Sequence, residues 1–257
     1  MDHLYRVSGA GGTFHAIGRR GDLLRALPTN GSIFNGYTAG EPVAGGLAAV
    51  RLLAPVSPSK LVCVGLNYRD HAREMGKPLP AEPMLFLKPS TAVIGPGESV
   101  VIPPGVGRVD YEGELGIVIG RRAHRVPKAD AWKYVLGLIC VNDVTARDLQ
   151  TKDVQYARAK GFDTFAPIGP AVAIGAGPEA RAVETWVNGS RRQSSDTSQL
   201  ICGLEELIAF ISFVMTLEPG DIISTGTPSG VGPLADGDTV TVKVEGIGEL
   251  TNAVGAE

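Results

Sequence analysis

Short apolar runs separated by turn-forming residues constrain the fold of this 257-residue chain most strongly. Gly occurs 34 times and Pro 18 times, and these residues divide the sequence into pieces that suit short strands better than long helices. Buried strands are expected at KLVCVGL (60–66) and LGLICVND (136–143), and a further strand, bounded by prolines, at PMLFLKP (83–89). The segment TVTVKVEGIGEL (239–250) alternates apolar and polar residues, which is typical of a hairpin strand.

Helices are expected at only a few places. Residues 204–215 repeat Leu and Ile at helical spacing, which predicts a helix that packs on the core. The segment PKADAWKYV (127–135) is expected to be a helix with Pro127 near its start. The segment VDYEGELGIVIG (109–120) is expected to be one strand with a fully apolar second half. Because strands and helices do not alternate regularly, we expect a β-rich α+β fold rather than a Rossmann fold or a TIM barrel.

The first 57 residues differ in character from the rest. Small-residue turns (GAGG, TNGS, AGEP) separate short apolar pieces, and the segment ends in the Pro/Ser connector LLAPVSPSK. We therefore expect a small N-terminal domain over residues 1–57 and a larger domain, which carries the chemistry, over residues 58–257.

The charge balance excludes several classes of partner. Lys plus Arg number 24 and Asp plus Glu 27, a net charge of −3, and no basic run occurs, so no nucleic-acid partner is expected. No apolar stretch approaches the length of a membrane span, and the N-terminus lacks a signal-peptide pattern, so we expect no membrane partner and a cytoplasmic location. Cys63, Cys140 and Cys202 lie far apart in apolar runs, which favours buried reduced thiols over a disulfide framework or a zinc site.

Motifs of several common enzyme classes are missing from the sequence. The patterns GxGxxG, GxxxxGK, HExxH and GxSxG do not occur, and neither does an EF-hand loop. Dinucleotide-binding, P-loop, zincin and α/β-hydrolase functions therefore have no support in the sequence.

Three carboxylates form the main candidate site. Glu112 and Glu114 flank Gly113 on the expected strand, so both side chains leave the same face, where like charges repel unless a cation or a shared proton compensates them. Taken alone, the pair is better explained as two solvent-facing side chains of an edge strand. Asp143 changes this interpretation, because it ends an apolar strand where a free charge is costly. Three carboxylates without Cys or His favour Mg²⁺, Mn²⁺ or Ca²⁺ over Zn²⁺.

His71 and Glu74 are a second candidate pair. They are three residues apart in NYRDHAREMG (67–76), which is expected to be a short polar helix or a mobile loop. If the segment is helical, the two residues share a face, and an imidazole beside a carboxylate suits proton transfer or the activation of water. Without further context, a surface helix with ordinary charges explains this segment better.

The polar stretch ARDLQTKDVQYARAKGFDTF contains further candidates for binding an anionic substrate. Arg147 can bind a carboxylate through two hydrogen bonds, and Lys160 can place a positive charge near a developing enolate. Gln150 lies between them. The Gly-rich loop around Thr227 offers hydroxyl and backbone N–H groups to an anion. A solvated charged loop and a tight turn remain the alternatives.

Taken together, six segments resemble the fumarylacetoacetate hydrolase family. They are VGLNYRDHAREM, LFLKP, DYEGELGIVIG, GLICVNDVTARDLQ, RAKGFDTFAPIGP and ISTGTPSGVG. They occur in family order across roughly residues 58–250. The resemblance implies the family's mixed β-sandwich roll with a small N-terminal domain, and homodimers as the common assembly.

The same resemblance implies roles for the candidate residues. The implied ligands of Mg²⁺ or Mn²⁺, with Ca²⁺ as a possible substitute in vitro, are Glu112, Glu114 and Asp143. The implied catalytic residues are His71 and Glu74, on a lid that orders over bound substrate, and Lys160. The implied substrate contacts are Arg147, Gln150 and Thr227.

The implied activity is that of an enzyme acting on small 2-oxo or enol acids through a metal-stabilised enolate. Short chains of the family resemble 2-hydroxyhepta-2,4-diene-1,7-dioate isomerases, acylpyruvases and oxaloacetate decarboxylases. We favour the isomerase or decarboxylase type. Hydrolysis of a C–C bond in acylpyruvates or fumarylpyruvate, and decarboxylation of oxaloacetate, are the alternatives. Other classes are a non-catalytic module that binds a metal and an organic acid, and a structural Ca²⁺ site.

Overall fold

The computed structural model describes residues 1–19 and 21–257. Strands make up 48% of the chain and helices 18%, which confirms the β-rich α+β class. Cys63, Cys140 and Cys202 are free and buried, as expected. In this described part of the chain, no helix has the length and apolar character needed to cross a membrane.

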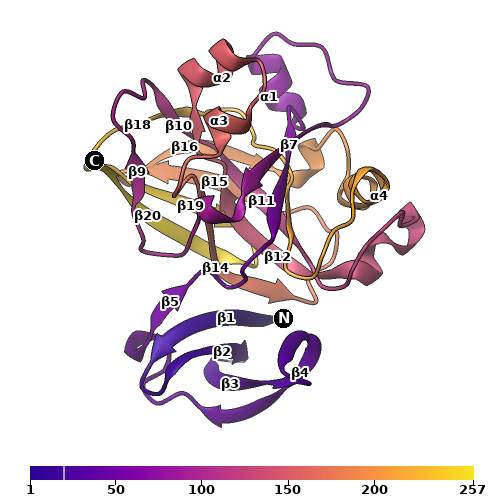
Figure 1. Ribbon diagram of the computed structural model, residues 1–257, viewed down its shortest axis with the longest axis vertical. Coiled ribbons are helices and arrows are strands. Elements are labelled where there is room, and N and C mark those ends of the chain that lie inside the picture. Colours follow the sequence, from indigo (N-terminus) through magenta and orange to yellow (C-terminus); the bar gives the residue numbers. More distant parts are fainter. Residues whose placement is uncertain (20) are drawn as a thin grey trace.

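The elements are distributed along the whole chain (Figure 1). The first ten strands are β1 (Asp2–Gly9), β2 (Gly12–Arg19), β3 (Asp22–Thr29), β4 (Ser32–Pro42), β5 (Arg51–Leu53), β6 (Lys60–Gly65), β7 (Met84–Pro89), β8 (Val93–Ile94), β9 (Val100–Ile102) and β10 (Val109–Tyr111). The later strands are β11 (Gly113–Ile119), β12 (Val135–Asn142), β13 (Thr145–Ala146), β14 (Ala166–Ile174), β15 (Ala182–Val187), β16 (Ser190–Asp196), β17 (Ile222–Ser224), β18 (Gly232–Leu234), β19 (Thr239–Val244) and β20 (Gly248–Ala256). The α-helices are α1 (Arg69–Glu74), α2 (Arg147–Asp153), α3 (Ala157–Lys160) and α4 (Leu204–Val214). The 3-10 helices are η1 (Gly46–Ala49), η2 (Ser90–Ala92), η3 (Lys128–Tyr134) and η4 (Thr197–Gln199).

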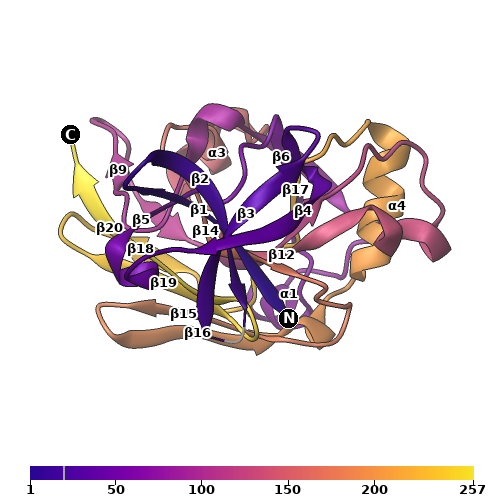
Figure 2. The same ribbon diagram turned by 90° about the horizontal axis from the view of Figure 1, so that it is seen from below.

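A sheet of 12 strands, counted over residues 1–19 and 21–257, forms the framework of the molecule. Its order is β4-β3-β2-β1-β14-β12-β11-β17-β6-β7, with β5 beside β1 and β8 beside β14. Because β1 pairs antiparallel with β14, with Leu4 opposite Val172, the N-terminal strands extend this sheet. Seen from below, β1 to β4 lie across one end of the molecule (Figure 2). The domain boundary at residue 57 stays a prediction.

The segment expected to be one strand over 109–120 is divided at Glu112. Strand β10 pairs with β13 and β18 in a small sheet, whereas β11 belongs to the main sheet. Side chains replace backbone partners at the break: Asn142 Oδ1 accepts the Glu112 N–H at 3.0 Å, and Gln193 Oε1 accepts the Gly113 N–H at 2.9 Å. A side chain at position 113 would collide with Thr185 Oγ1, so this close approach requires glycine. The break therefore bends the chain at the first candidate ligand.

The largest buried cluster lies between the main sheet, α4 and the sheet that contains β15, β19 and β20. Leu207 and Ile208 of α4 belong to the same buried cluster as Ile117 of β11 and Leu138 of β12, so the expected core-packing helix is confirmed. The helix expected over 127–135 is the 3-10 helix η3, which begins after Pro127 and packs against α4. The β19–β20 hairpin is present as expected, within a separate sheet of order β16-β15-β19-β20-β9.

Candidate active site

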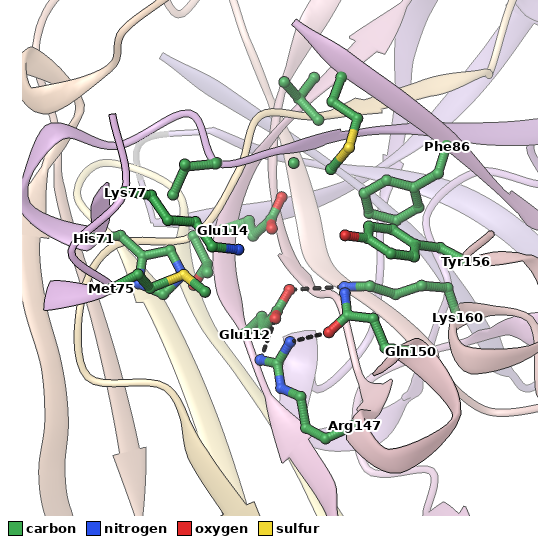
Figure 3. Close-up of a pocket in the computed structure, with 15 residues that line it drawn as sticks. His71, Met75, Lys77, Phe86, Glu112, Glu114, Arg147, Gln150, Tyr156 and Lys160 are labelled. Atoms are coloured by element: carbon green, nitrogen blue, oxygen red, sulfur yellow. Dashed lines mark hydrogen bonds and ion pairs between the residues drawn. The ribbon is translucent and has the colours of Figure 1, made fainter. Parts of the chain in front are cut away.

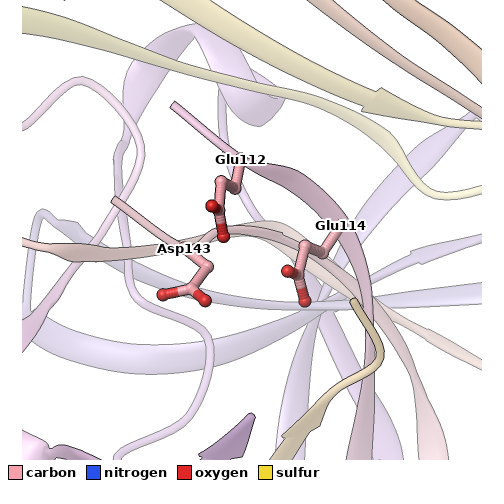
Figure 4. A group of neighbouring side chains, drawn as sticks. All are labelled: Glu112, Glu114 and Asp143. Carbon is pink, nitrogen blue, oxygen red and sulfur yellow. The ribbon is translucent and has the colours of Figure 1, made fainter. Parts of the chain in front are cut away.

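Strand register brings the three candidate metal ligands together. Strands β11 and β12 pair antiparallel with Gly113 opposite Asn142, and one residue beyond that pair the Asp143 N–H donates to the Glu112 carbonyl at 2.8 Å. Glu114 lies two residues after Glu112, on the same face of the chain. One carboxylate oxygen from each of the three residues lies within 4.8 Å of the others (Figure 4). All three carboxylates are buried.

Two of the carboxylates have cationic partners. Lys160 Nζ donates to Glu112 Oε2 at 2.8 Å and to Asp143 Oδ2 at 2.6 Å, and the Arg147 guanidinium donates to Glu112 Oε1. Burial alone raises the pKa of Glu112, but Lys160 and Arg147 outweigh it and lower that pKa to about 2. Burial likewise lowers the pKa of Lys160, but the charges of Asp143 and Glu112 outweigh it and raise that pKa above its ordinary value. Glu112 is therefore ionised and Lys160 protonated at neutral pH.

Glu114 has a different environment. Its Oε2 atom accepts hydrogen bonds from Ser224 Oγ at 2.5 Å and from the Gly226 N–H at 2.8 Å, which are both neutral donors. Burial, followed by the charges of Asp143 and Glu112, raises the pKa of Glu114 well above its ordinary value. Gly226 has φ 99°, a conformation that favours glycine and that directs its N–H at this carboxylate. The site thus contains a buried carboxylate that faces two others without a cationic partner among the described residues.

The donor set fits a hard divalent cation. Its atoms are carboxylate oxygens, the ligands that Mg²⁺ and Mn²⁺ prefer. Asp143 Oδ1 is buried and accepts no hydrogen bond from residues 1–19 and 21–257. Lys88 Nζ lies 2.8 Å from that oxygen, but it donates to the backbone carbonyls of Val144, Lys160 and Phe165 at 2.8–2.9 Å, so its three protons are already used. An added cation would compensate both this oxygen and Glu114.

Sequence reasoning assigned no role to Lys88, which is fully buried beneath the acidic cluster. Burial lowers its pKa, and the charge of Asp143 partly offsets that effect. The carbonyls that it binds belong to Val144, which follows Asp143, to Lys160, and to Phe165, which precedes β14, so it joins the segments that carry the site. The signal in the sequence was a lysine within the apolar run LFLKP, because a lysine that is buried with such a run needs a partner.

The segment that contains His71 and Glu74 forms helix α1. The two side chains share a face, and His71 Nδ1 lies 2.9 Å from Glu74 Oε2. Glu74 also accepts the Gly230 N–H at 3.0 Å, which connects α1 with the Gly-rich loop after β17. His71 is 8% exposed and lines a cavity of about 100 Å³ whose floor includes Glu112 and Glu114.

Helix α1 has only six residues, and contacts outside the helix hold it over the cavity. Asp70 accepts a hydrogen bond from Ser195 Oγ of β16 at 2.5 Å. The Arg69 guanidinium donates to the Leu200 carbonyl. A six-residue helix is not stable by itself, so these few bonds determine whether it stays in place.

The expected substrate contacts line the same cavity. Arg147 donates to Gln150 Oε1 at 2.8 Å as well as to Glu112, which orders both side chains (Figure 3). Thr227 Oγ1 donates to the Gly113 carbonyl at 3.0 Å and accepts from Gln193 Nε2 at 2.8 Å. The structure thus brings all nine sequence-derived site residues together, and their individual roles stay predictions.

Several other side chains of this cavity escaped sequence reasoning. Figure 3 shows Phe86 and Tyr156 on the wall beside Lys160, and Lys77 and Met75 on the side of α1. Lys160 Nζ lies 4.8 Å from the centre of the Phe86 ring. No motif marks these residues, because their place depends on how β7, α1 and α3 meet in space.

Comparison with known proteins agrees with this geometry. Residues 60–255 match the family model described as "Fumarylacetoacetate (FAA) hydrolase C-terminal". The chain is 45% identical over 224 residues to oxaloacetate tautomerase YisK of Bacillus subtilis, covering 81% of this chain and 74% of that protein.

Two solved structures are similar over nearly the whole chain. The 2-hydroxyhepta-2,4-diene-1,7-dioate isomerase of Mycobacterium marinum has a TM-score of 0.91 and 41% identity, covering 100% of this chain and 99% of that one. The 5-carboxymethyl-2-hydroxymuconate delta-isomerase of Mycobacterium smegmatis has a TM-score of 0.89 and 46% identity, covering 99% of each chain. Together with the family match, these likenesses establish that the chain is an enzyme of the fumarylacetoacetate hydrolase family.

Proposed function

We propose that this enzyme depends on Mg²⁺ or Mn²⁺ and acts on small 2-oxo acids through an enolate, as an isomerase or decarboxylase of the 2-hydroxyhepta-2,4-diene-1,7-dioate type. An isomerase shifts a proton between keto and enol forms, whereas a decarboxylase releases CO₂ and then protonates the enolate that remains. One observation supports this proposal most: His71, Lys160, and Glu112 and Glu114 of the acidic cluster border a single cavity (Figure 3). An acid–base group and a fixed positive charge thus face the place where a substrate enolate would form.

The acidic cluster supplies the electrostatic part of this proposal. A divalent cation held by Glu112, Glu114 and Asp143 would contribute positive charge that favours the enolate over the keto form. Lys160 adds a permanent positive charge beside them, because its pKa is raised by Asp143 and Glu112 despite its burial. Arg147 and Gln150, already hydrogen-bonded to each other, orient the substrate carboxylate.

The His71–Glu74 pair supplies the proton transfer. The contact at Nδ1 fixes the imidazole ring and leaves Nε2 as the atom that can take up or deliver a proton. Its burial at the cavity wall keeps that atom close to a bound substrate and away from bulk water. The names of the three similar proteins, one tautomerase and two isomerases, support a proton shift as the reaction.

Hydrolysis of a C–C bond in an acylpyruvate or in fumarylpyruvate is the second candidate function. It is favoured by the same His71–Glu74 contact, because a positioned imidazole can also activate a water molecule. Decarboxylation of oxaloacetate needs the cation and the positive charges but no activated water.

A metal-supplemented assay tests the proposal. Oxaloacetate tautomerisation, isomerisation of a 2-hydroxydienoate, acylpyruvate hydrolysis and oxaloacetate decarboxylation are measured with Mg²⁺, with Mn²⁺ and after EDTA treatment. We expect metal-dependent turnover in at least one proton-shift assay, and we expect His71→Ala to reduce proton shift or hydrolysis about 10²-fold or more while affecting decarboxylation far less. Full activity after removal of the metal, or equal losses in all assays, would contradict the proposal.

We also propose that the enzyme is a homodimer in the cytoplasm, as the family resemblance implies. Light scattering coupled to size-exclusion chromatography gives the mass in solution, and a value close to the 26.8 kDa of one chain would contradict the dimer.

A further inference from the structure

Two cavities adjoin at the candidate active site. The inner one, about 100 Å³, contains Glu112 and Glu114, and the outer one, about 710 Å³, contains Arg108, Asp110 and Asp148. The residues that border both cavities are His71, Met75, Lys77, Arg147, Gln150 and Tyr156. A 2-oxo acid whose reacting end occupies the inner cavity therefore extends its other end past these residues.

The cations around the two cavities are almost all paired within the protein. Lys160 is bound by Glu112 and Asp143. The Arg147 guanidinium binds Asp110 Oδ2 through Nε at 2.8 Å and Glu112 through Nη2, and its third nitrogen, Nη1, donates to Gln150. These side chains can orient a substrate, but their charges are already balanced by carboxylates. Arg108 is balanced in the same way, because it donates to both oxygens of Asp110, at 2.7 and 3.0 Å.

Lys77 is the exception among the cations that line these cavities. Within the chain described, residues 1–19 and 21–257, no carboxylate lies within 4.0 Å of its ammonium group. Its backbone N–H donates to the Ala72 carbonyl at 3.0 Å, which fixes the start of its side chain just after α1. Figure 3 shows the Lys77 side chain reaching from the side of α1 into the cavity. Lys77 thus presents one uncompensated positive charge to any part of a substrate that extends out of the inner cavity.

The charges of the outer cavity reinforce this placement. Asp110 and Asp148 lie on the wall that carries Arg108 and Arg147, so the charges on that wall balance one another and provide no net attraction for a substrate carboxylate. The other side carries Lys77 and, at the outer rim, Glu74, whose carboxylate is already bound by His71 and the Gly230 N–H. A second carboxylate on the substrate is therefore attracted to a single position.

We propose that Lys77 determines specificity by binding the distal carboxylate of 2-oxo dicarboxylic acids, while the 2-oxo acid end occupies the inner cavity. This rests on the proposed function, since it presumes that a 2-oxo acid binds at the acidic cluster. A charge-assisted hydrogen bond to a partly enclosed carboxylate contributes about 1.5 kcal/mol, which corresponds to about tenfold in affinity. The enzyme then prefers dicarboxylic over monocarboxylic 2-oxo acids without any change in the reacting groups.

Matched ligand pairs test this assignment. Affinities of the Mn²⁺-loaded protein are measured by calorimetry for 2-oxo dicarboxylic acids of four, five and six carbons. Each is compared with the monocarboxylic acid in which a methyl group replaces the distal carboxylate. The variants are Lys77→Met, which keeps the length but removes the charge, and Lys77→Arg, which restores the charge. Lys152→Met is the control, because it removes an exposed charge from nearby α2 that borders neither cavity.

For at least one chain length, we expect the wild-type protein and Lys152→Met to bind the dicarboxylic acid about tenfold more tightly than its partner. Lys77→Met should reduce this ratio to about one, and Lys77→Arg should restore most of it. The wild-type ratio should also fall as ionic strength rises. A structural role alone would weaken both members of a pair equally and leave the ratio unchanged.

Other results overturn the assignment in distinguishable ways. If every ratio is the same in Lys77→Met and the wild type, Lys77 does not bind the distal carboxylate, although the proposed function stands as long as 2-oxo acids bind in a metal-dependent way. If no 2-oxo acid binds with or without Mn²⁺, the proposed function itself fails, and the role of Lys77 fails with it.

Discussion

Asp221 and Glu114 are both buried carboxylates beside strand β17, but their surroundings differ. Asp221 lies just before β17 and accepts hydrogen bonds from Ser59 N and Oγ at 2.9 and 2.7 Å, from the Lys60 and Glu218 N–H groups, and from the Lys60 ammonium. Glu114 contacts the other end of β17, where it receives two neutral donors and faces two carboxylates.

The two environments shift acidity in opposite directions. Burial raises the pKa of Asp221, but its hydrogen bonds, that of Lys60 first, outweigh burial and lower it overall. Burial and the neighbouring carboxylates raise the pKa of Glu114. Asp221 thus has enough hydrogen-bond donors to compensate its charge, whereas Glu114 lacks positive charge nearby, as expected of the metal ligand that we propose it to be. We propose that this difference distinguishes a structural acidic residue, Asp221, from a functional one, Glu114, without reference to any motif.

Removing the charge of Glu114 should have the largest effect on activity. In Glu114→Gln, Gln Oε1 can still accept the hydrogen bonds from Ser224 and Gly226, but the site loses one negative ligand for the cation. We expect turnover in the metal-dependent assay to fall by about 10³-fold or more, and the affinity for Mn²⁺ to fall with it. Asp221→Asn provides the comparison and should keep Mn²⁺ binding. Wild-type affinity for Mn²⁺ in Glu114→Gln would count against the ligand role.

Removing the charge of Asp221 should have the largest effect on stability. We expect Asp221→Asn to lower the free energy of unfolding at pH 7 by about 1.5–3 kcal/mol, because several donors lose a charged acceptor. Since the folded state lowers the pKa of Asp221, its contribution is complete above the ordinary pKa of about 4 and is lost as the pH falls through the folded-state pKa. Urea unfolding curves from pH 7 to pH 3 check this, and a difference that grows towards low pH would contradict the assignment.

The attachment of α1 should contribute a smaller amount. Ser195→Ala removes the hydrogen bond from β16 to Asp70 and leaves the acidic cluster intact. We expect kcat/KM to fall about threefold to tenfold, because closing α1 over the cavity becomes less favourable by about 1 kcal/mol. Mn²⁺ affinity, measured in the same preparation, should stay unchanged. A loss of Mn²⁺ binding would show that the helix and the cluster are not separable.

The smallest expected change is in the free energy of unfolding of metal-free Glu114→Gln. The raised pKa of Glu114 means that its ionised form destabilises the folded protein, and this cost grows as the pH rises. The neutral amide avoids the cost, so the EDTA-treated variant should be as stable as the wild type or up to about 1 kcal/mol more stable. The matched variant Glu112→Gln should lose stability instead, because it weakens contacts to Lys160 and Arg147.

The acidic cluster could be predicted from the sequence because the residue patterns that mark it lie within short segments. Glu112 and Glu114 are two residues apart, and Asp143 ends an apolar strand, so both features can be read from short windows. The break of the chain at Glu112 could not be predicted in this way. It depends on Asn142 and on Gln193, which is 80 residues from Gly113, and such long-range hydrogen bonds leave no periodic pattern.

The same limit applies to the cavity walls. Lys88 was visible only as a lysine in an apolar run, and its role depends on three carbonyls that lie 56 to 77 residues further along the chain. Lys77 and Tyr156 carry no signal, since exposed polar residues near turns are common. The extent of the main sheet was also hidden, because the pairing of β1 with β14 joins segments more than 160 residues apart.

Strand β17 limits the insertions and deletions that the site can tolerate. It has only three residues, yet Asp221 anchors one end of it, and Ser224 at its other end holds Glu114. Its backbone lies between β6 and β11 in the main sheet, so it acts as a short spacer of fixed length between a structural anchor and the acidic cluster. An insertion or deletion of one residue in β17 would turn side chains of the strand to the opposite face of the sheet. It would also displace Asp221 and Ser224 relative to each other. Length variation is therefore far less acceptable in this strand than in the surface loops around it.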